Sequence, residues 1–366
     1  MTATQTSAAP PPRMSSGGRT WAQDLFGSPA RWAFTLAVCA LLAWSLWHLL
    51  PWGLMNATFT ASADACRAHR EGACWGVVAE KWRPVLFGRY PYAEQWRAAC
   101  AGGLLAAMTL VSAWPRVWRW WLAPLWAAVL AAAFVLMGGG ALGLSKVPTG
   151  QWGGLPLTIL LAVLGVAMAF PIGLGLALGR RSDWPVVRTL CASYIELVRG
   201  VPLISVLFMA TFLLPLLWPI GAQPDVLLRV VVGQGLFIAA YLAEVIRGGL
   251  QAVPQGQLDA ARALGFTRWG VQRAIVLPQA LRMVVPALTN IVLGALKDTS
   301  LVTVVGLFEL TGALSLALGG DPNWRPFYLE AYLFVAAIYW LLCFGLARYG
   351  LWLEGFLRRE HTSARG

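Results

Sequence analysis

Long apolar runs alternate with short polar segments along this chain. Four windows contain no Asp, Glu, Lys or Arg: 32–63, 120–145, 147–179 and 200–224. Each is longer than the roughly 20 residues that an α-helix needs to cross a bilayer. With the remaining apolar stretches, the pattern predicts about eight membrane-spanning helices, over 32–50, 98–114, 118–140, 154–179, 190–217, 226–247, 283–305 and 328–352. We therefore expect an all-α, polytopic membrane protein.

Composition agrees with a membrane protein. Of 366 residues, 58% are hydrophobic and 12% charged, and the mean hydropathy is +0.64. A soluble domain of this size would not tolerate such a surface. The formal charge of +12 would suggest nucleic-acid binding in a soluble protein. Here most cations are arginines in short loops between spans, and no basic patch with interleaved aromatics is visible. We expect no nucleic-acid partner.

No catalytic or metal-binding constellation emerges from the residues. The chain has only three lysines, and none belongs to a Gly-x-x-x-x-Gly-Lys-Ser/Thr phosphate loop. Its three histidines, His48, His69 and His361, are scattered, so neither a triad nor a metal motif is suggested. A transporter of this kind that used ATP would need a separate hydrolase.

A polar, helix-forming segment lies between the predicted spans 226–247 and 283–305. Its first part reads DAARALG over Asp259–Gly265, and IVLP follows after nine residues at Ile275–Pro278. The alanines predict a smooth helix surface, and Gly265 permits a sharp turn. Pro278 is expected to end a second short helix. The pattern predicts a hairpin shaped to be gripped by another protein, and the alternative is an ordinary interhelical hairpin.

Two Glu and Arg pairs stand three residues apart, a spacing that places both side chains on one helix face. They are Glu196 with Arg199, and Glu244 with Arg247. Each pair is either a salt bridge at a helix end or part of a gate beside the polar hairpin. Both interpretations stay open at this point.

A third charged motif lies deep in a predicted span. A helix that starts near Pro286 reaches Lys297 and Asp298 about halfway through a ~30 Å hydrocarbon core. Thr299 and Ser300 add hydroxyl groups directly after them. Ionisable residues at this depth are costly and face a cavity or a partner. They either neutralise each other at a helix interface or line a translocation path, where a cation and an anion suit an amino-acid zwitterion.

The hairpin pattern resembles the EAA loop of ATP-binding-cassette importer permeases: Glu-Ala-Ala, three residues, Gly, nine residues, Ile-x-Leu-Pro. Every spacing matches, and the one departure is Asp259, which keeps the charge of the usual Glu on a shorter arm. In that family the loop is held in a cleft of a cytoplasmic ATPase. The residues that the resemblance assigns to ATPase coupling are Asp259, Ala260, Ala261, Gly265, Ile275, Leu277 and Pro278.

The charged motifs extend the resemblance. Tyr-x-Glu-x-x-Arg-Gly-x-Pro-Leu over 194–203, Ala-Tyr-x-Ala-Glu-x-x-Arg-Gly-Gly over 240–249 and Lys-Asp-Thr-Ser-Leu over 297–301 are similar to permeases for histidine, glutamine and arginine. The resemblance covers roughly 154–355. It implies a MetI-like (type I importer) core of five spans that works by alternating access. A periplasmic binding protein would deliver the amino acid, and an ATPase dimer would use ATP and Mg, with no cofactor on this chain.

The first 150 residues exceed that core. The polar loop 53–97, through its segments 74–83 and 87–92, resembles the extended N-terminal part of general L-amino-acid permeases. Those systems pair two different permeases, which implies a second permease subunit in a heterodimer. We divide the chain into a disordered tail (1–30), an extension of three transmembrane helices (31–150), a permease core (151–355) with its coupling loop (251–282), and a C-terminal tail (356–366).

The predicted topology places the protein in a bacterial inner membrane with both termini in the cytoplasm. If the coupling loop is cytoplasmic, counting crossings puts the arginines of the loops 115–117 and 180–189 inside, as the positive-inside rule requires. The loop 53–97 then lies outside despite its six cations. In an oxidising periplasm, Cys66 and Cys74 of this loop are expected to form a disulfide. A zinc site is not expected, because only His69 is near.

Two other classes of protein remain as alternatives. A self-sufficient channel or ion-coupled carrier would leave the hairpin without a purpose, and the sequence shows no inverted repeat. A membrane enzyme would need an acid–base or metal cluster, which the sequence lacks. The resemblance therefore favours the permease subunit of an ATP-driven amino-acid importer.

Overall fold

The computed structural model describes residues 25–219 and 222–363, so most of the predicted tail 1–30 lies outside the described residues. The described chain forms two compact units. The first unit comprises the residues up to Phe59 together with Asp64–Cys74, and the second comprises Thr60–Ala63 and the chain from Trp75 onwards.

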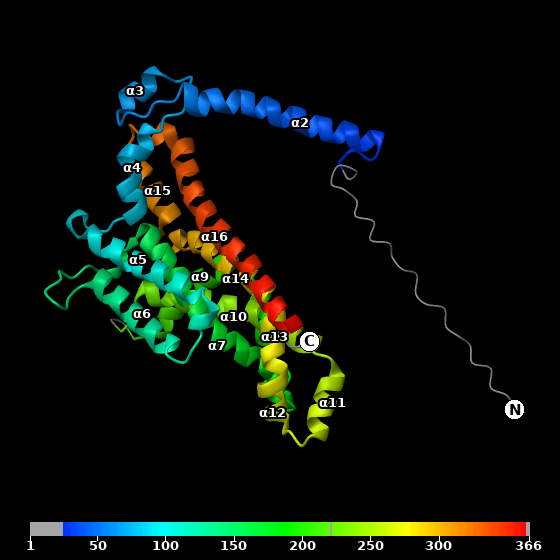
Figure 1. The fold of residues 1–366 in the computed structure, drawn as a ribbon. Helices are drawn as coiled ribbons and strands as arrows, with labels where there is room; N and C mark the ends of the chain where they lie inside the picture. The colour runs from blue at the N-terminus through cyan, green and yellow to red at the C-terminus, as the bar shows by residue number, and fades with distance from the viewer. Residues whose placement is uncertain (1–24, 220–221, 364–366) are drawn as a thin grey trace. The chain divides into compact units, whose positions relative to one another are not determined.

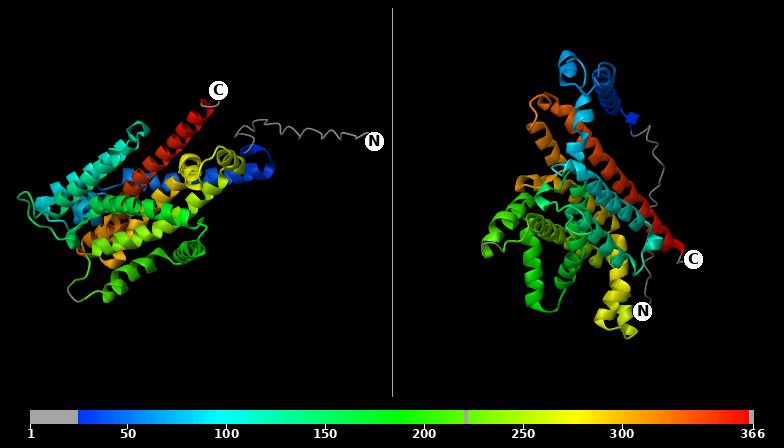
Figure 2. Two further views of the ribbon diagram at one scale, coloured as in Figure 1. Left: turned by 90° about the horizontal axis from the view of Figure 1, so that it is seen from below. Right: turned by 90° about the vertical axis from the view of Figure 1, so that its left-hand side faces the viewer.

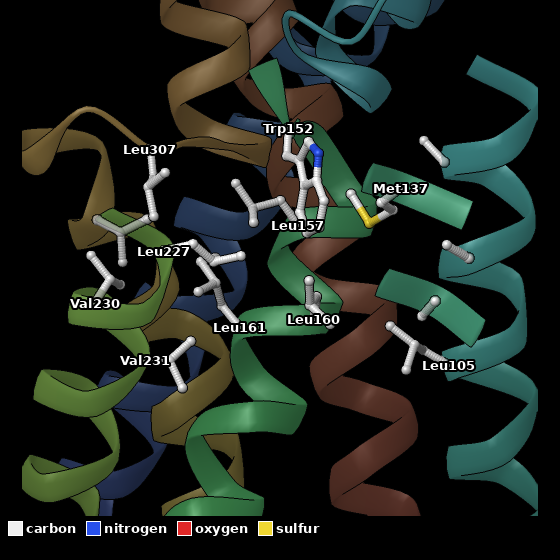
Figure 3. Close-up of a cluster of buried hydrophobic side chains, with 14 of the residues drawn as sticks. Leu105, Met137, Trp152, Leu157, Leu160, Leu161, Leu227, Val230, Val231 and Leu307 are labelled. Atoms are coloured by element: carbon white, nitrogen blue, oxygen red, sulfur yellow. The ribbon is translucent and has the colours of Figure 1, made fainter. Parts of the chain in front are cut away.

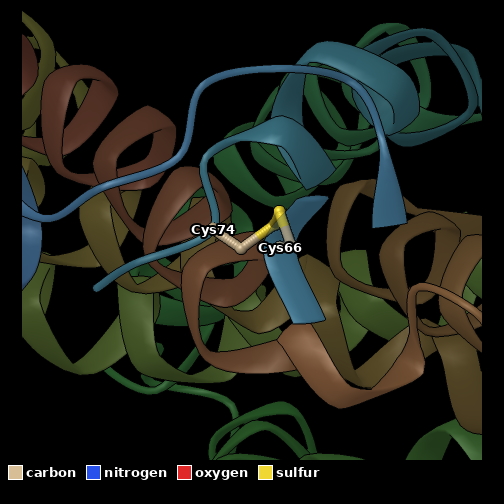
Figure 4. The surroundings of a disulfide bond; sticks show 2 residues. All are labelled: Cys66 and Cys74. Carbon is tan, nitrogen blue, oxygen red and sulfur yellow. A yellow bond between two sulfur atoms is a disulfide. The ribbon is translucent and has the colours of Figure 1, made fainter. Parts of the chain in front are cut away.

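The first unit is a long helix followed by a pinned loop. Helix α2 (Pro29–Leu50) continues into a π-helical turn, Pro51–Met55, and together they form a 27-residue candidate membrane span. The short α3 (Ala63–Ala68) crosses the boundary between the units, and its Cys66 is joined to Cys74 by a disulfide (Figure 4). The Cα atoms of the two cysteines lie 5.5 Å apart.

The second unit is a helical bundle with one very short strand (Figures 1 and 2). Its helices are α4 (Gly76–Phe87), α5 (Gln95–Ser112), α6 (Leu122–Gly138), α7 (Gly154–Gly179), α8 (Pro185–Arg199), α9 (Leu203–Phe208), α10 (Val226–Ala252), α11 (Gln255–Ala263), α12 (Arg268–Val271), α13 (Leu277–Met283), α14 (Val285–Asp298), α15 (Leu310–Gly319) and α16 (Tyr328–Ser363), and β1 is Phe308–Glu309.

Membrane spans are fewer than the sequence predicts. Within the described residues, five helices are long and apolar enough to cross a membrane, or six if a bent pair counts as one span. Helices α5 and α6 fill the predicted spans 98–114 and 118–140 but have only 18 and 17 residues. At about 1.5 Å per residue they are slightly shorter than a ~30 Å core. The predicted number of eight is therefore approximate.

The predicted span 190–217 is broken. The chain bends by 108° between α8 and the helical segment Leu203–Leu217. Gly200 and Pro202 lie in the break, and the proline restricts the residue before it to extended backbone. Helix α8 carries apolar residues along one side and charged residues along the other. Such a helix suits a membrane surface better than a hydrocarbon core.

Helix α16 continues beyond the predicted span 328–352 and into the predicted tail 356–366, as far as Ser363. No proline follows the predicted end of the span at 352. Nothing in the local sequence therefore stops the helix there.

The core is built around α7 and α10, which pack side by side (Figure 2). At Gly173 a Cβ atom would lie 2.6 Å from Leu242 Cδ2 and 2.9 Å from the Ala239 carbonyl oxygen, so glycine is what lets the two backbones approach. A buried apolar cluster fills the neighbouring space between helices (Figure 3). It includes Leu105, Met137, Trp152, Leu157, Leu160, Leu161, Leu227, Val230, Val231 and Leu307.

The segment from Arg268 to Asp298 is almost continuously helical. It passes through α12, a π-helical turn at Gln272–Val276, α13 and α14, and departs from helix only at Val284. Where α10 crosses it, a Cβ on Gly249 would lie 2.5 Å from Val284 Cγ1 and 2.8 Å from the Ala280 carbonyl oxygen. The crossing is therefore a close contact.

Candidate functional site

The polar segment between α10 and α14 forms a helical hairpin that projects from one end of the bundle (Figure 1). We call residues 255–283 the coupling hairpin. Helix α11 forms its first arm, and α12, the π-helical turn and α13 form the second. Gly265 has a φ of +85°, and the Phe266 N–H donates to the Ala261 carbonyl at 3.2 Å. The predicted turn is thus made at the glycine, where no Cβ opposes this backbone conformation.

Two adjacent alanines of the hairpin, Ala260 and Ala261, face opposite environments. Ala260 is exposed, whereas Ala261 is 2% exposed and packs in a cluster with Leu258, Val271 and Val276. Asp259 is exposed on the outer face, where its Oδ1 lies 3.3 Å from Arg262 Nη1 and accepts a 3.2 Å hydrogen bond from Gln255. The outer face of α11 is therefore smooth and polar, and its inner face holds the hairpin together.

Pro278 does not end the second arm, and this part of the prediction is wrong. Pro278 occupies the first turn of α13, and helix continues to Met283. Proline is tolerated at the start of a helix, where its missing N–H has no partner to lose. The wider π-helical turn at Gln272–Val276 directly precedes α13 and lets the two segments join. Ile275 and Leu277 are half-buried beside Pro278, which is exposed.

An ion-pair cluster joins the ends of α7 and α8 to α10. Arg180, at the end of α7, donates through Nη2 to Glu196 of α8 at 2.9 Å and through Nη1 to Glu244 of α10 at 3.2 Å. Glu244 is also paired with Arg247 one turn along the same helix. Arg199 Nη1 lies 3.9 Å from the same carboxylate. We call these five side chains the helix-end cluster.

The cluster differs from the two separate pairs that the spacing suggests. Glu244 and Arg247 are paired, but Glu196 is bonded to Arg180, and Arg199 lies near Glu244. In the sequence Arg180 stands out only as a loop cation, because its partners are 16 and 64 positions away. The Arg180 and Glu244 side chains are each 24% exposed. Partial burial strengthens such ion pairs over fully exposed ones.

Lys297 and Asp298 lie at the end of α14, within the candidate span Val285–Val305. In the part of the chain that the structure describes, no ion pair joins them, in keeping with the divergent directions of adjacent side chains on a helix. Lys297 is exposed and Asp298 half-buried. The hydroxyls of Thr299 and Ser300 donate back to the carbonyls of Leu296 and Lys297, at 2.7 and 2.8 Å.

Glu309 is a buried carboxylate that sequence analysis misses. It has no exposed surface and accepts five hydrogen bonds from neighbouring segments. The donors are the N–H groups of Thr311 and Gly312 at 2.9 Å, Tyr339 Oη at 2.7 Å, Thr158 Oγ1 at 3.3 Å and Thr303 Oγ1 at 3.4 Å. A lone acid in an apolar stretch, directly before a helix, is the signal that could have found it. Glu309 anchors α15 beside the 299–305 segment.

This geometry defines a class: a multi-pass helical membrane protein with a polar helical hairpin at one end of its bundle. Comparison with known proteins gives the family. Residues 169–359 match the binding-protein-dependent transport system inner membrane component family. The inner membrane amino-acid ABC transporter permease protein YhdY of Escherichia coli K12 is 41% identical over 355 residues, 93% of each chain.

A second relative also matches over nearly the full length. The glutamate/glutamine/aspartate/asparagine transport system permease protein BztC of Rhodobacter capsulatus is 35% identical and covers 96% of each chain. A crystal structure of an amino acid ABC transporter with histidines is 32% identical, covers 56% of this chain and 90% of that chain, and has a TM-score of 0.49. The chain belongs to the family of binding-protein-dependent transport system inner membrane components. It is a permease, a membrane transport subunit and not an enzyme.

Proposed function

We propose that this chain is the membrane-spanning permease subunit of an ATP-driven amino-acid importer, and that ATP hydrolysis is coupled to it through the coupling hairpin. Two relatives that match nearly the whole chain are described as amino-acid permeases. Substrate would come from a periplasmic binding protein. A separate ATPase dimer would bind ATP and Mg, and this chain would bind neither.

The observation that carries the proposal is the surface of the coupling hairpin. Around its tip, Leu264, Phe266 and Trp269 are 78%, 45% and 65% exposed, next to the exposed face of Asp259 and Ala260. An apolar patch of this kind outside the membrane marks a protein contact. Arginines surround the patch, so an acidic cleft on the partner would complement it.

Crosslinking tests the docking face, because the two adjacent alanines give a matched pair. In a background where the four free cysteines are replaced, Ala260→Cys should crosslink to the ATPase subunit in membranes. Ala261→Cys should react far less, since its side chain packs inward. Equal crosslinking at both positions, or crosslinking to a periplasmic protein, would reject this docking face.

The substrate would pass beside Lys297 and Asp298. The exposed cation and the half-buried acid lie in one span without pairing, so each remains available to one end of an amino-acid zwitterion. Lys297→Ala should abolish uptake while leaving the ATPase bound, and Lys297→Arg should retain part of it. Wild-type uptake by Lys297→Ala at normal expression would remove Lys297 from the path.

The helix-end cluster would serve as the cytoplasmic gate. It joins α7, α8 and α10 at the end where the coupling hairpin leaves the bundle. Ion pairs between separate helices can open when the helices move apart, which gives such a cluster two arrangements. In this topology both termini and the hairpin are cytoplasmic, the 53–97 loop is periplasmic, and a second permease completes the pore.

Reconstitution into liposomes tests the proposal as a whole. Amino-acid uptake should require ATP, the ATPase subunit, the binding protein and both permeases together. Uptake that an ion gradient drives without ATP would reject the importer and indicate a carrier instead.

A further inference from the structure

Helix α4 packs against α15 (Figure 1). Helix α4 belongs to the first 150 residues, outside the region 169–359 that matches the family, whereas α15 lies within it. The contact therefore links the N-terminal extension to the permease core. It has one anchor near each end of α15.

The first anchor is an ion pair. Lys81 Nζ of α4 donates to Asp321 Oδ2, just beyond α15, at 2.7 Å. The two side chains are 14% and 30% exposed. The other carboxylate oxygen of Asp321 accepts from the Asn323 N–H at 3.1 Å, which fixes it to the turn after α15. The hydrogen bond from Lys81 is the main cause that lowers the pKa of Asp321, so the acid is ionised at neutral pH.

The second anchor is a backbone contact where α4 ends. A Cβ atom on Gly88 would lie 2.8 Å from Gly153 Cα. Gly153 in turn forms a parallel β-bridge with Phe308, and the Arg89 guanidinium lies 6.0 Å from the Phe308 ring centroid. Helix α4 thus runs antiparallel to α15 and contacts the segments at both of its ends. Because both residues of this contact are glycines, no side chain can rotate away to make room.

Helix α15 also packs against the segment that follows Lys297 and Asp298. A Cβ on Gly312 would lie 2.3 Å from Thr303 Oγ1, and Thr303 also donates to Glu309 at the start of α15. Helix α15 therefore cannot shift without changing its contacts with the 299–305 segment, which adjoins the proposed path.

We propose that α4 holds α15 in place, and we call this contact the brace. The Lys81–Asp321 ion pair opens when the importer accepts substrate from its binding protein. The glycine contact stays closed and is the point about which α4 and α15 then move. Lys81 is then a positioning residue for transport. An ion pair between two separate segments can open and re-form when the segments move. The backbone contact cannot be relieved by rotamer changes. The inference rests on the proposed function and assigns the N-terminal extension a role in it.

The test measures ATP hydrolysis by the complete reconstituted transporter, with and without its binding protein. Lys81→Met keeps the length of the side chain and removes the charge. We expect basal hydrolysis to rise about threefold and stimulation by the binding protein to shrink, because the braced state is less populated. Lys81→Asp combined with Asp321→Lys should restore the wild-type ratio of binding-protein-stimulated to basal ATP hydrolysis. Lys146→Met, which changes an exposed lysine in the same extension, should leave the ratio unchanged.

A crosslink separates this role from a merely structural one. With the four free cysteines replaced, Lys81→Cys and Asp321→Cys joined by a short bis-maleimide should abolish stimulated uptake in a protein that still folds and binds the ATPase. Full uptake by the crosslinked transporter, or an unchanged ratio in Lys81→Met, would overturn the brace. Failure of the proposed function would look different, because the wild-type complex itself would then lack ATP-dependent uptake.

Discussion

At the scale of single residues, Arg180 shows where sequence reasoning stops. The three-residue spacing within a helix predicts the Glu244–Arg247 pair, because one helical turn fixes that geometry. The partners of Arg180 lie on two other helices, so only the packing of α7, α8 and α10 brings them together. For the same reason the partner of Glu196 could not be read from its neighbour Arg199.

Arg180→Ala should weaken coupling across the helix-end cluster. Removing one guanidinium leaves Glu196 and Glu244 without their shared partner, and we expect stimulated uptake to fall about tenfold, as a loss of about 1.4 kcal/mol would cause. Uptake at equal expression in proteoliposomes measures the effect. Arg188→Ala, at an exposed position on α8, is the matched control. Equal losses of uptake in both variants would indicate a general effect of removing a positive charge, and would contradict a specific role for the helix-end cluster.

Glu94 gives a pH dependence. Its carboxylate accepts from Ser145 Oγ at 2.8 Å and from Arg97 Nη1 at 3.2 Å, and these two hydrogen bonds, Ser145 first, lower the pKa of Glu94 below its ordinary 4.5. A lowered acid pKa means that the stabilisation is complete above the unfolded value and is lost as the pH falls through the folded value. The stabilisation therefore begins to be lost as the pH falls below about 4.5 and is gone only below the lowered pKa of Glu94.

Glu94→Gln should accordingly have a lower thermal unfolding midpoint than wild type at pH 7. The difference should shrink steadily as the pH drops below about 4.5, where the wild-type carboxylate takes up its proton. Unfolding curves of both detergent-purified proteins between about pH 3 and 7 measure this. A constant difference over the whole range would contradict the assignment.

At the scale of elements, the coupling hairpin and the 190–217 segment differ from the sequence prediction in opposite ways. A helix continues where an end is predicted in the first, and a predicted single span is broken in the second. Pro278 suggested a helix end but lies in the first turn of α13, where a proline costs no hydrogen bond. The apolar stretch 190–217 predicts one membrane span, but the chain bends by 108° between Arg199 and Leu203, where Gly200 and Pro202 lie. Apolar composition predicts that a segment enters the membrane. It does not predict whether the segment crosses in one piece.

The close approach of α7 and α10 makes a prediction at the same scale. Gly173→Val should destabilise the protein by about 1–3 kcal/mol, because the added atoms meet the Leu242 side chain and the Ala239 carbonyl. Gly175→Val, two residues along the same helix, adds its atoms where nothing lies within 4 Å. Thermal unfolding of the two variants in one detergent compares them. Similar midpoints would show that the helices separate without cost.

At the scale of the whole molecule, the sequence predicts the class, the family and the coupling hairpin, since these depend on local pattern and spacing. It does not predict the position of α4 against α15, which depends on a lysine and an aspartate 240 positions apart. It also misses Glu309, three of whose five donors, on Thr158, Thr303 and Tyr339, come from other segments. Contacts between polar residues far apart in the sequence leave no repeating pattern in it, so they become visible only in the three-dimensional structure.

The proposed topology predicts opposite labelling of two exposed positions. Lys146→Cys should react with a membrane-impermeant maleimide on intact spheroplasts, because the α6–α7 connection faces the periplasm. Ala263→Cys, at the end of α11, should react only after the membrane is permeabilised. The parent with its free cysteines replaced gives the background. Labelling of Ala263→Cys in intact spheroplasts would invert the topology.

The nearly continuous helix from Arg268 to Asp298 has a mechanical consequence. Its 31 residues make a rod about 46 Å long at 1.5 Å per residue. The segment contacts α10 tightly at Gly249, close to its midpoint, and we expect this crossing to act as a fulcrum when the segment moves. A tilt of about 5° about that point carries each end by about 2 Å, in opposite directions. Under the proposed function, a push by the ATPase on the hairpin would therefore move the end beside Lys297 in the opposite direction.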